Sequence, residues 1–158
     1  MKNSKYFILI SVIFLFLSNK SFANHQALTW DFGLAFGNYG GNNYTEYNLG
    51  INLFFYPWLS IRNSGYYRAA DDDNAIYGLD SSLRGHLNLK LTEAATFLSH
   101  AGGGYRFSNR GKSTPFLETS IGIRATRMII SGGIKYLLHS VVTDNANNEM
   151  IYLVTISI

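Results

Sequence analysis

Apolar residues recur at every second position through most of this chain, and nearly all charged residues fall on the positions between them. A β-strand sends successive side chains to opposite faces, so a period of two gives each strand one apolar and one polar face. In residues 27–37, one face carries Leu28, Trp30, Phe32, Leu34 and Phe36, and the other carries Thr29, Asp31, Gly33 and Ala35. The pattern predicts an all-β chain.

Eight segments keep this alternation, and two kinds of connection separate them. The segments span residues 27–37, 44–55, 59–69, 77–90, 95–107, 117–124, 128–142 and 149–158. Tight turns at 56–58, at 92–94 and near Thr126 alternate with longer polar connections at 38–43, 70–74, 108–113 and 143–148. Bacterial membrane barrels have an even number of antiparallel strands, short periplasmic turns and longer extracellular loops. The connections therefore predict a closed up-and-down barrel.

The glycines indicate which face lies inside. The polar face carries Gly33, Gly50, Gly78, Gly102, Gly104, Gly122 and Gly133. A narrow eight-stranded interior needs small residues beside long ones, whereas glycines on a solvated surface would only weaken the strands. Aromatic residues gather near segment ends on the apolar face, as in interfacial girdles. The sequence favours an eight-stranded antiparallel transmembrane β-barrel with a polar, plugged interior. The alternative, a lipocalin-like periplasmic carrier, would have an apolar lumen.

Charges inside a packed lumen must be paired, because an unpaired buried charge is costly. Hairpin registers centred on the tight turns place possible partners opposite each other. The predicted interior network has Glu46 opposite Arg68, Asp80 opposite Arg106, His86 opposite His100 and Glu118 opposite Lys135, with Asn52 opposite Arg62. Three ion pairs from three separate turns predict a plugged barrel rather than an open channel.

The first 23 residues have the composition of a secretory signal peptide. Lys2 and Lys5 precede an apolar run over residues 6–17, which is too short to span a bilayer as a helix. Ser21-Phe22-Ala23 has the small-x-small pattern of a cleavage site, so we expect cleavage after Ala23 and a barrel domain over residues 24–158.

Cleavage changes the charge balance. The full chain has 13 Lys and Arg against 10 Asp and Glu, and three of these lysines (Lys2, Lys5 and Lys20) leave with the signal. The remaining balance gives no electrostatic basis for nucleic-acid binding. The chain has no cysteine, so the exported domain must be stable without disulfides or thiolate-bound metal.

Three stretches resemble the OmpA/OmpX-like family of outer-membrane barrels. They are Gly102-Gly103-Gly104-Tyr105-Arg106-Phe107, Thr114-Pro115-Phe116-Leu117-Glu118 and Ile121-Gly122-Ile123. The resemblance covers the expected mature chain and implies an integral outer-membrane protein that the barrel-assembly machinery inserts. Such barrels usually end in an aromatic residue, whereas Ile158 is found here.

The resemblance also brings in an enzymatic alternative, because small outer-membrane barrels include lipid A acyl hydrolases and acyltransferases. The only candidate catalytic cluster near an extracellular end is His139, Ser140 and Glu149. His139 and Ser140 are adjacent, so strand alternation would send them to opposite faces. The deacylase pattern His-x-Ser-Asn and a palmitoyltransferase-type N-terminal helix are both missing from the sequence. An enzyme is therefore the less favoured interpretation.

The sequence offers two candidate metal sites, and neither has a sufficient set of ligands. His86 and His100 are too few ligands for a metal centre without a carboxylate at their level, and the run Asp71-Asp72-Asp73 lacks the spacing of a calcium loop. We therefore expect no metal and no cofactor. The expected protein is a monomeric structural or surface-interaction barrel of the Gram-negative outer membrane, in contact with lipid and lipopolysaccharide.

Overall fold

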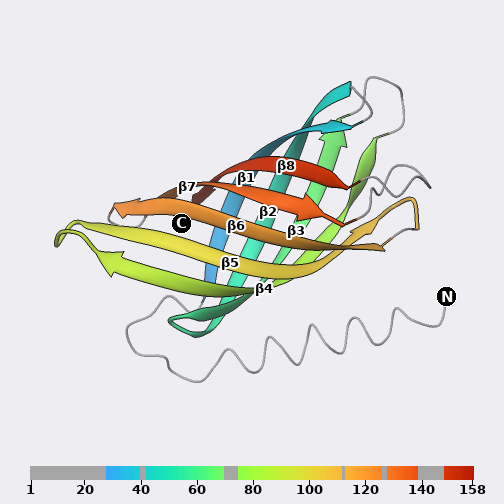
Figure 1. Ribbon diagram of the computed structural model, residues 1–158. Coiled ribbons are helices and arrows are strands. Elements are labelled where there is room, and N and C mark those ends of the chain that lie inside the picture. The colour runs from blue at the N-terminus through green and yellow to red at the C-terminus, as the bar shows by residue number, and fades with distance from the viewer. Residues whose placement is uncertain (1–27, 40–41, 70–74, 112, 126–127, 139–147) are drawn as a thin grey trace.

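The chain folds into a closed antiparallel barrel. The computed structural model describes residues 28–39, 42–69, 75–111, 113–125, 128–138 and 148–158. Within them lie eight strands: β1 (Leu28–Tyr39), β2 (Asn42–Tyr56), β3 (Leu59–Ala69), β4 (Ile76–Lys90), β5 (Ala95–Ser108), β6 (Ser113–Ala125), β7 (Met128–Leu137) and β8 (Glu149–Ser157). Each strand pairs with the next, and β8 pairs with β1 (Figure 1). No helix among these residues is long and apolar enough to cross a bilayer. The signal segment and Ala23 lie outside the described residues.

Most observed strands agree with the predicted segments, but β6 begins at Ser113, four residues before the predicted segment 117–124, and two connections also differ. The 38–43 connection was predicted to be long, but Tyr39 pairs with Asn42, which leaves only residues 40–41 between β1 and β2. The sequence at these two positions is Gly-Gly, a dipeptide that favours two-residue hairpins. The prediction that the seventh strand reaches Val142 was also wrong within the described part, because β7 ends at Leu137 and Leu138 is already a bend.

The barrel has two distinct ends. The C-terminal ends of β2, β4 and β6 lie at the left and bottom of Figure 1, and those of β1, β3, β5 and β7 lie at its right and upper right. We call these the turn end and the loop end. The N-terminal residue of β1 and the C-terminus both belong to the turn end, where Trp30 and Ile158 exchange two backbone hydrogen bonds of 3.1 and 2.9 Å.

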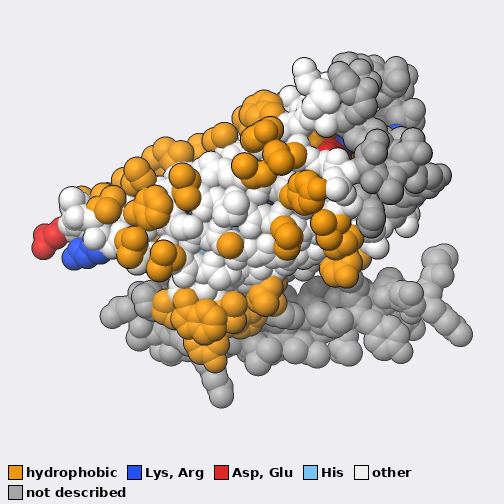
Figure 2. All heavy atoms as spheres, viewed as in Figure 1, with side chains coloured by type: hydrophobic (Ala, Val, Ile, Leu, Met, Phe, Trp, Pro, Cys, Tyr) orange, Lys and Arg blue, Asp and Glu red, His pale blue; other side chains and the backbone are white. Residues whose placement is uncertain are grey.

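The outer wall of the barrel is apolar. The exposed large hydrophobic side chains, each 37–59% exposed, lie mostly on the outer wall, and Figure 2 shows hydrophobic side chains spread along this wall. Near the loop end the outward aromatic residues form a belt of Phe36, Tyr47, Tyr67, Tyr77, Tyr105, Phe107, Tyr136 and Tyr152. At the turn end Tyr56 stacks on Trp58 with ring centroids 5.6 Å apart. An apolar band between aromatic residues matches the hydrocarbon core and interfaces of a bilayer.

Most of the interior is polar, as predicted, but one small part of it is apolar. The buried side chains include four arginines, one lysine and five carboxylates, namely Arg62, Arg68, Arg84, Arg106, Lys135, Asp31, Glu46, Asp80, Glu118 and Glu149. Beside them lies a small apolar cluster of Ala35, Phe116, Leu137 and Ile151, contributed by β1, β6, β7 and β8. A charged lumen contradicts the lipocalin-like alternative, which requires an apolar cavity.

Candidate functional site

The centre of the lumen is organised around Arg106, whose side chain is fully buried. Its Nε and Nη2 donate to the two oxygens of Asp80, each at 2.8 Å. Its Nη1 and Nη2 donate to the two oxygens of Glu46, also at 2.8 Å. The guanidinium lies 3.9 Å from the ring centroid of Tyr66. One arginine on β5 therefore joins carboxylates from β2 and β4 by four charge-assisted hydrogen bonds.

The network continues from this centre toward the loop end. Arg68 lies 3.3 Å from Glu46 and 2.9 Å from Glu149, and its guanidinium stacks 3.7 Å from the ring centroid of Tyr44. The Tyr44 hydroxyl donates to Glu149. Each of these carboxylates and cations therefore has a partner of opposite charge.

Toward the turn end two further pairs complete the network. Arg84 donates to the two oxygens of Glu118 at 2.7 and 2.9 Å. Arg62 donates to the two oxygens of Asp31 at 2.9 and 2.5 Å. The Nδ2 of Asn52 donates to Asp31 at 2.8 Å, and its Oδ1 accepts from Arg84 at 3.2 Å. Asn52 thus links the two pairs.

The registers agree with the predicted placements, but several ion pairs reach across the lumen instead of to the next strand. Glu46 is opposite Arg68, Asp80 is opposite Arg106, His86 is opposite His100 and Glu118 is opposite Lys135. However, Lys135 Nζ lies 2.5 Å from Asp80 and 3.9 Å from Glu118. Glu118 instead makes its short contacts with Arg84, which projects from β4.

Sequence reasoning missed Asp31, Arg62 and Arg84 as members of the ion-pair network. Their signal was present, since all three lie on the polar face of the alternation. Their ion-pair partners could not be predicted from hairpin registers. For example, Arg62 on β3 binds Asp31 on β1, and β2 lies between these two strands. Gly50, on β2, leaves room for this pair, since a Cβ there would lie 2.6 Å from Asp31 Oδ1 and 2.9 Å from Arg62 Nη2.

His86 and His100 lie close together near the turn end. Their ring centroids are 5.6 Å apart. His86 Nε2 is hydrogen-bonded to Ser60 Oγ at 2.7 Å, and His100 Nδ1 to Ser120 Oγ at 2.9 Å. No group of three or more potential His, Cys, Asp or Glu metal ligands occurs in the described part of the chain. In this arrangement each imidazole binds a serine and not its neighbour.

The candidate catalytic cluster is only partly placed. His139 and Ser140 lie outside the described residues. Glu149 is buried in the lumen, where Arg68 and Tyr44 bind it. The Asp71-Asp72-Asp73 run also lies outside the described residues.

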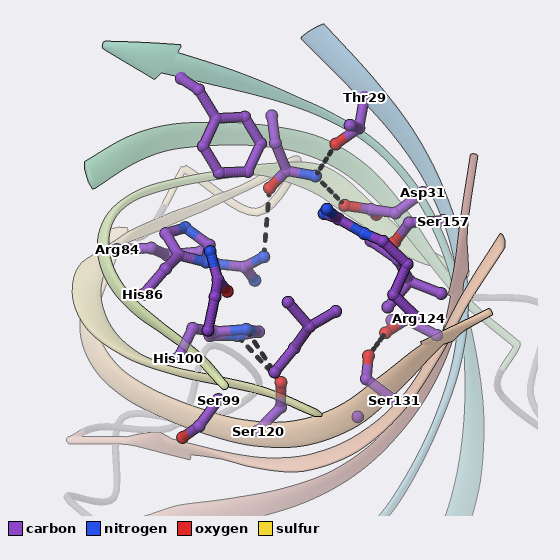
Figure 3. A pocket seen from close by; sticks show the side chains of 17 residues that line it. Thr29, Asp31, Arg84, His86, Ser99, His100, Ser120, Arg124, Ser131 and Ser157 are labelled. Atoms are coloured by element: carbon purple, nitrogen blue, oxygen red, sulfur yellow. Dashed lines mark hydrogen bonds between the residues drawn. The ribbon is translucent and has the colours of Figure 1, made fainter. Parts of the chain in front are cut away.

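A polar cavity of about 70 Å³ occupies the turn end of the lumen. We call it the turn-end cavity. Its inner side includes Asp31 and Arg84 of the ion-pair network, and its wall includes His86, His100 and Arg124. Figure 3 shows the two histidines on one side of this cavity, and Arg124 on the other side with Ser131 and Ser157.

Comparisons with known proteins identify the fold. No family model matches the sequence, and no curated protein sequence matches it. The structure is similar to that of the outer membrane enzyme PagL, with a TM-score of 0.62, 11% sequence identity, and coverage of 81% of this chain and 98% of that one.

Two other solved structures extend this comparison. Neisserial surface protein A matches with a TM-score of 0.53 and 10% identity over 83% of this chain and 94% of that one. A de novo designed transmembrane β-barrel matches with a TM-score of 0.56 and 9% identity over 82% of this chain and 95% of that one. At these identities the likeness shows the fold alone, which is that of an eight-stranded transmembrane β-barrel.

Proposed function

We propose that this chain is an integral outer-membrane protein of a Gram-negative bacterium with a structural or surface-interaction role, and that it is not a wide pore. The observation that carries the proposal is the lumen, where Arg106, Lys135 and Glu46 are all fully buried and paired. An eight-stranded interior filled by paired side chains leaves no continuous aqueous path.

The route to the membrane is part of the proposal. The signal-like first 23 residues support export with cleavage after Ala23. The apolar wall and its aromatic belt support direct contact with membrane lipid and, in the outer leaflet, with lipopolysaccharide. We further propose insertion by the barrel-assembly machinery and a monomeric state.

Two measurements test this function. In a cold detergent extract of outer membranes the protein should migrate as a compact form on a gel and shift on boiling, because a closed barrel keeps its hydrogen-bond ladder until it is heated. In planar lipid bilayers the same protein should give no stable channel steps. Recovery in the soluble periplasmic fraction would overturn the membrane assignment, and large stable conductance would overturn the closed lumen.

A lipid A acyl hydrolase or acyltransferase is the second candidate, and the fold likeness to the outer membrane enzyme PagL is what favours it. Against it, Glu149 is already bound to Arg68 and Tyr44 inside the lumen, so it is not free to orient a histidine at the outer leaflet. Mass spectrometry of lipid A from expressing cells tests whether the protein has this enzymatic activity. A change in acyl-chain number would support the enzyme, and unchanged lipid A would reject it.

A further inference from the structure

The turn-end cavity has one charged group that no other part of the described chain neutralises. Arg124 on β6 lines the cavity, and within the described ranges no carboxylate lies at ion-pair distance from it. Every cation deeper in the lumen has such a carboxylate. Arg124 therefore differs from the rest of the interior arginines.

The other charges around the cavity are already paired. Asp31 is the one carboxylate that lines it, and both of its oxygens accept hydrogen bonds from Arg62. Arg84 also lines the cavity, but it is bound to Glu118 through two hydrogen bonds. The Asp31–Arg62 and Arg84–Glu118 pairs are each neutral overall. The remaining charge around the cavity is therefore the positive charge of Arg124.

The remaining polar wall is rich in groups that donate hydrogen bonds. Ser131 and Thr155 lie beside the cavity with their hydroxyl oxygens 2.5 Å apart. His86 and His100 face it across from Arg124 (Figure 3). Hydroxyl and imidazole groups can donate to an anion, and an arginine supplies a planar fork that matches the oxygens of a phosphate or carboxylate.

We propose that the turn-end cavity is a binding site for a small oxyanion of the phosphate class, held by Arg124 together with the serine, threonine and histidine side chains around it. A cation is disfavoured because the single lining carboxylate is already saturated. A large ligand is excluded by the cavity volume of about 70 Å³. The oxyanion could be free in solution or could belong to a lipid headgroup at the turn-end rim.

The test uses histidine as the reporter. The full protein, purified from membranes of expressing cells in a phosphate-free detergent, is labelled with ¹³C-histidine, of which the chain has four. At constant pH, inorganic phosphate is added, and sodium chloride at equal ionic strength serves as the control. We expect saturable shifts of the His86 and His100 signals with phosphate and none with chloride.

Variants assign the site to Arg124. Arg124→Gln should weaken phosphate binding at least about tenfold, because it removes a charge-assisted hydrogen bond. Arg124→Lys keeps the charge but loses the fork, so its affinity should be intermediate. Lys90→Gln removes one positive charge from the exposed β4–β5 hairpin outside the cavity, and it should bind like the wild type.

A second titration separates the two sources of the anion. Short-chain phosphatidylglycerol replaces inorganic phosphate as the probe. Shifts with both probes, or with phosphate alone, support a site for free oxyanion, and shifts with the lipid alone support a headgroup site. The proposal is overturned if neither probe gives a saturable shift, or if Arg124→Gln binds as tightly as the wild type.

Discussion

The replacement of Arg106 by glutamine is the sharpest test of the plugged lumen. The substitution removes four hydrogen bonds of 2.8 Å to Glu46 and Asp80. Breaking a buried ion pair costs about 3–5 kcal/mol, because a carboxylate then stays buried without its counter-charge. After the substitution, Glu46 still has Arg68 at 3.3 Å and Asp80 still has Lys135 at 2.5 Å as counter-charges. The loss in free energy of unfolding should therefore stay within the range for one broken pair.

The free energy of unfolding can be followed by denaturant titration of the barrel in lipid vesicles. The two tryptophans are both exposed, Trp30 on the outer wall and Trp58 in the β2–β3 turn, so their fluorescence reports the transfer from lipid to water. Arg106→Gln should lower the free energy of unfolding by about 3–5 kcal/mol. The exposed Lys90→Gln is the matched control and should change it by less than about 0.5 kcal/mol.

A double substitution tests the mechanism of this loss. In Arg106→Gln combined with Glu46→Gln, one of the two carboxylates that lose Arg106 is neutral, so the combined cost should fall short of the sum of the single costs by about 1 kcal/mol or more. An Arg106→Gln cost no larger than that of Lys90→Gln would refute the reasoning. Such a result would mean that water stabilises the carboxylates of Glu46 and Asp80 as well as Arg106 does. The lumen would then not be plugged.

The remaining predictions concern the wall, a glycine and the export signal. Leu83→Arg, halfway along β4 on the outer face, should destabilise the barrel by about 2–4 kcal/mol, whereas Leu91→Arg beyond the end of β4 should cost about 0–1 kcal/mol, because the cost of a charge facing lipid depends on depth. Equal costs in the same titration would mean that Leu83 does not face the bilayer core. Gly50→Ala should cost about 1–3 kcal/mol, because its Cβ would lie 2.6 Å from Asp31 Oδ1. Gly85→Ala, whose Cβ would meet only a backbone oxygen at 3.8 Å, is the control and should stay within about 0.5 kcal/mol. Terminal sequencing of the membrane-bound protein should begin at Asn24, and an intact Met1 would contradict the expected cleavage after Ala23.

The sequence predicted the register between neighbouring strands well, because a tight turn determines how the two strands that it joins are aligned. A turn centred on Glu93 sets Asp80 opposite Arg106, and the strands pair in that register. The β1–β2 connection was wrong because residues 38–43 were counted as loop, although the Gly-Gly pair within them allows the strands to continue to Tyr39 and Asn42.

The sequence could not predict contacts across the lumen. Arg84 on β4 binds Glu118 on β6, and Lys135 on β7 binds Asp80 on β4. These strands are not neighbours, so their contact depends on how far the strands are staggered when the barrel closes. That stagger is a property of all eight strand pairs together, and no single turn contains it.

The lumen is closed in two physically different ways at once, which the alternation alone would not reveal. Glu46, Asp80 and Arg106 come from β2, β4 and β5, whereas the apolar cluster comes from β1, β6, β7 and β8. The two halves meet at Lys135, whose Nζ contacts Asp80 at 2.5 Å and lies 4.4 Å from the ring centroid of Phe116. Ion pairs alone would leave gaps that water could enter, and an apolar cluster alone could not neutralise the buried charges. Because both halves block the path, the turn-end cavity is a dead end, and any oxyanion it holds must enter and leave through the turn end of the barrel.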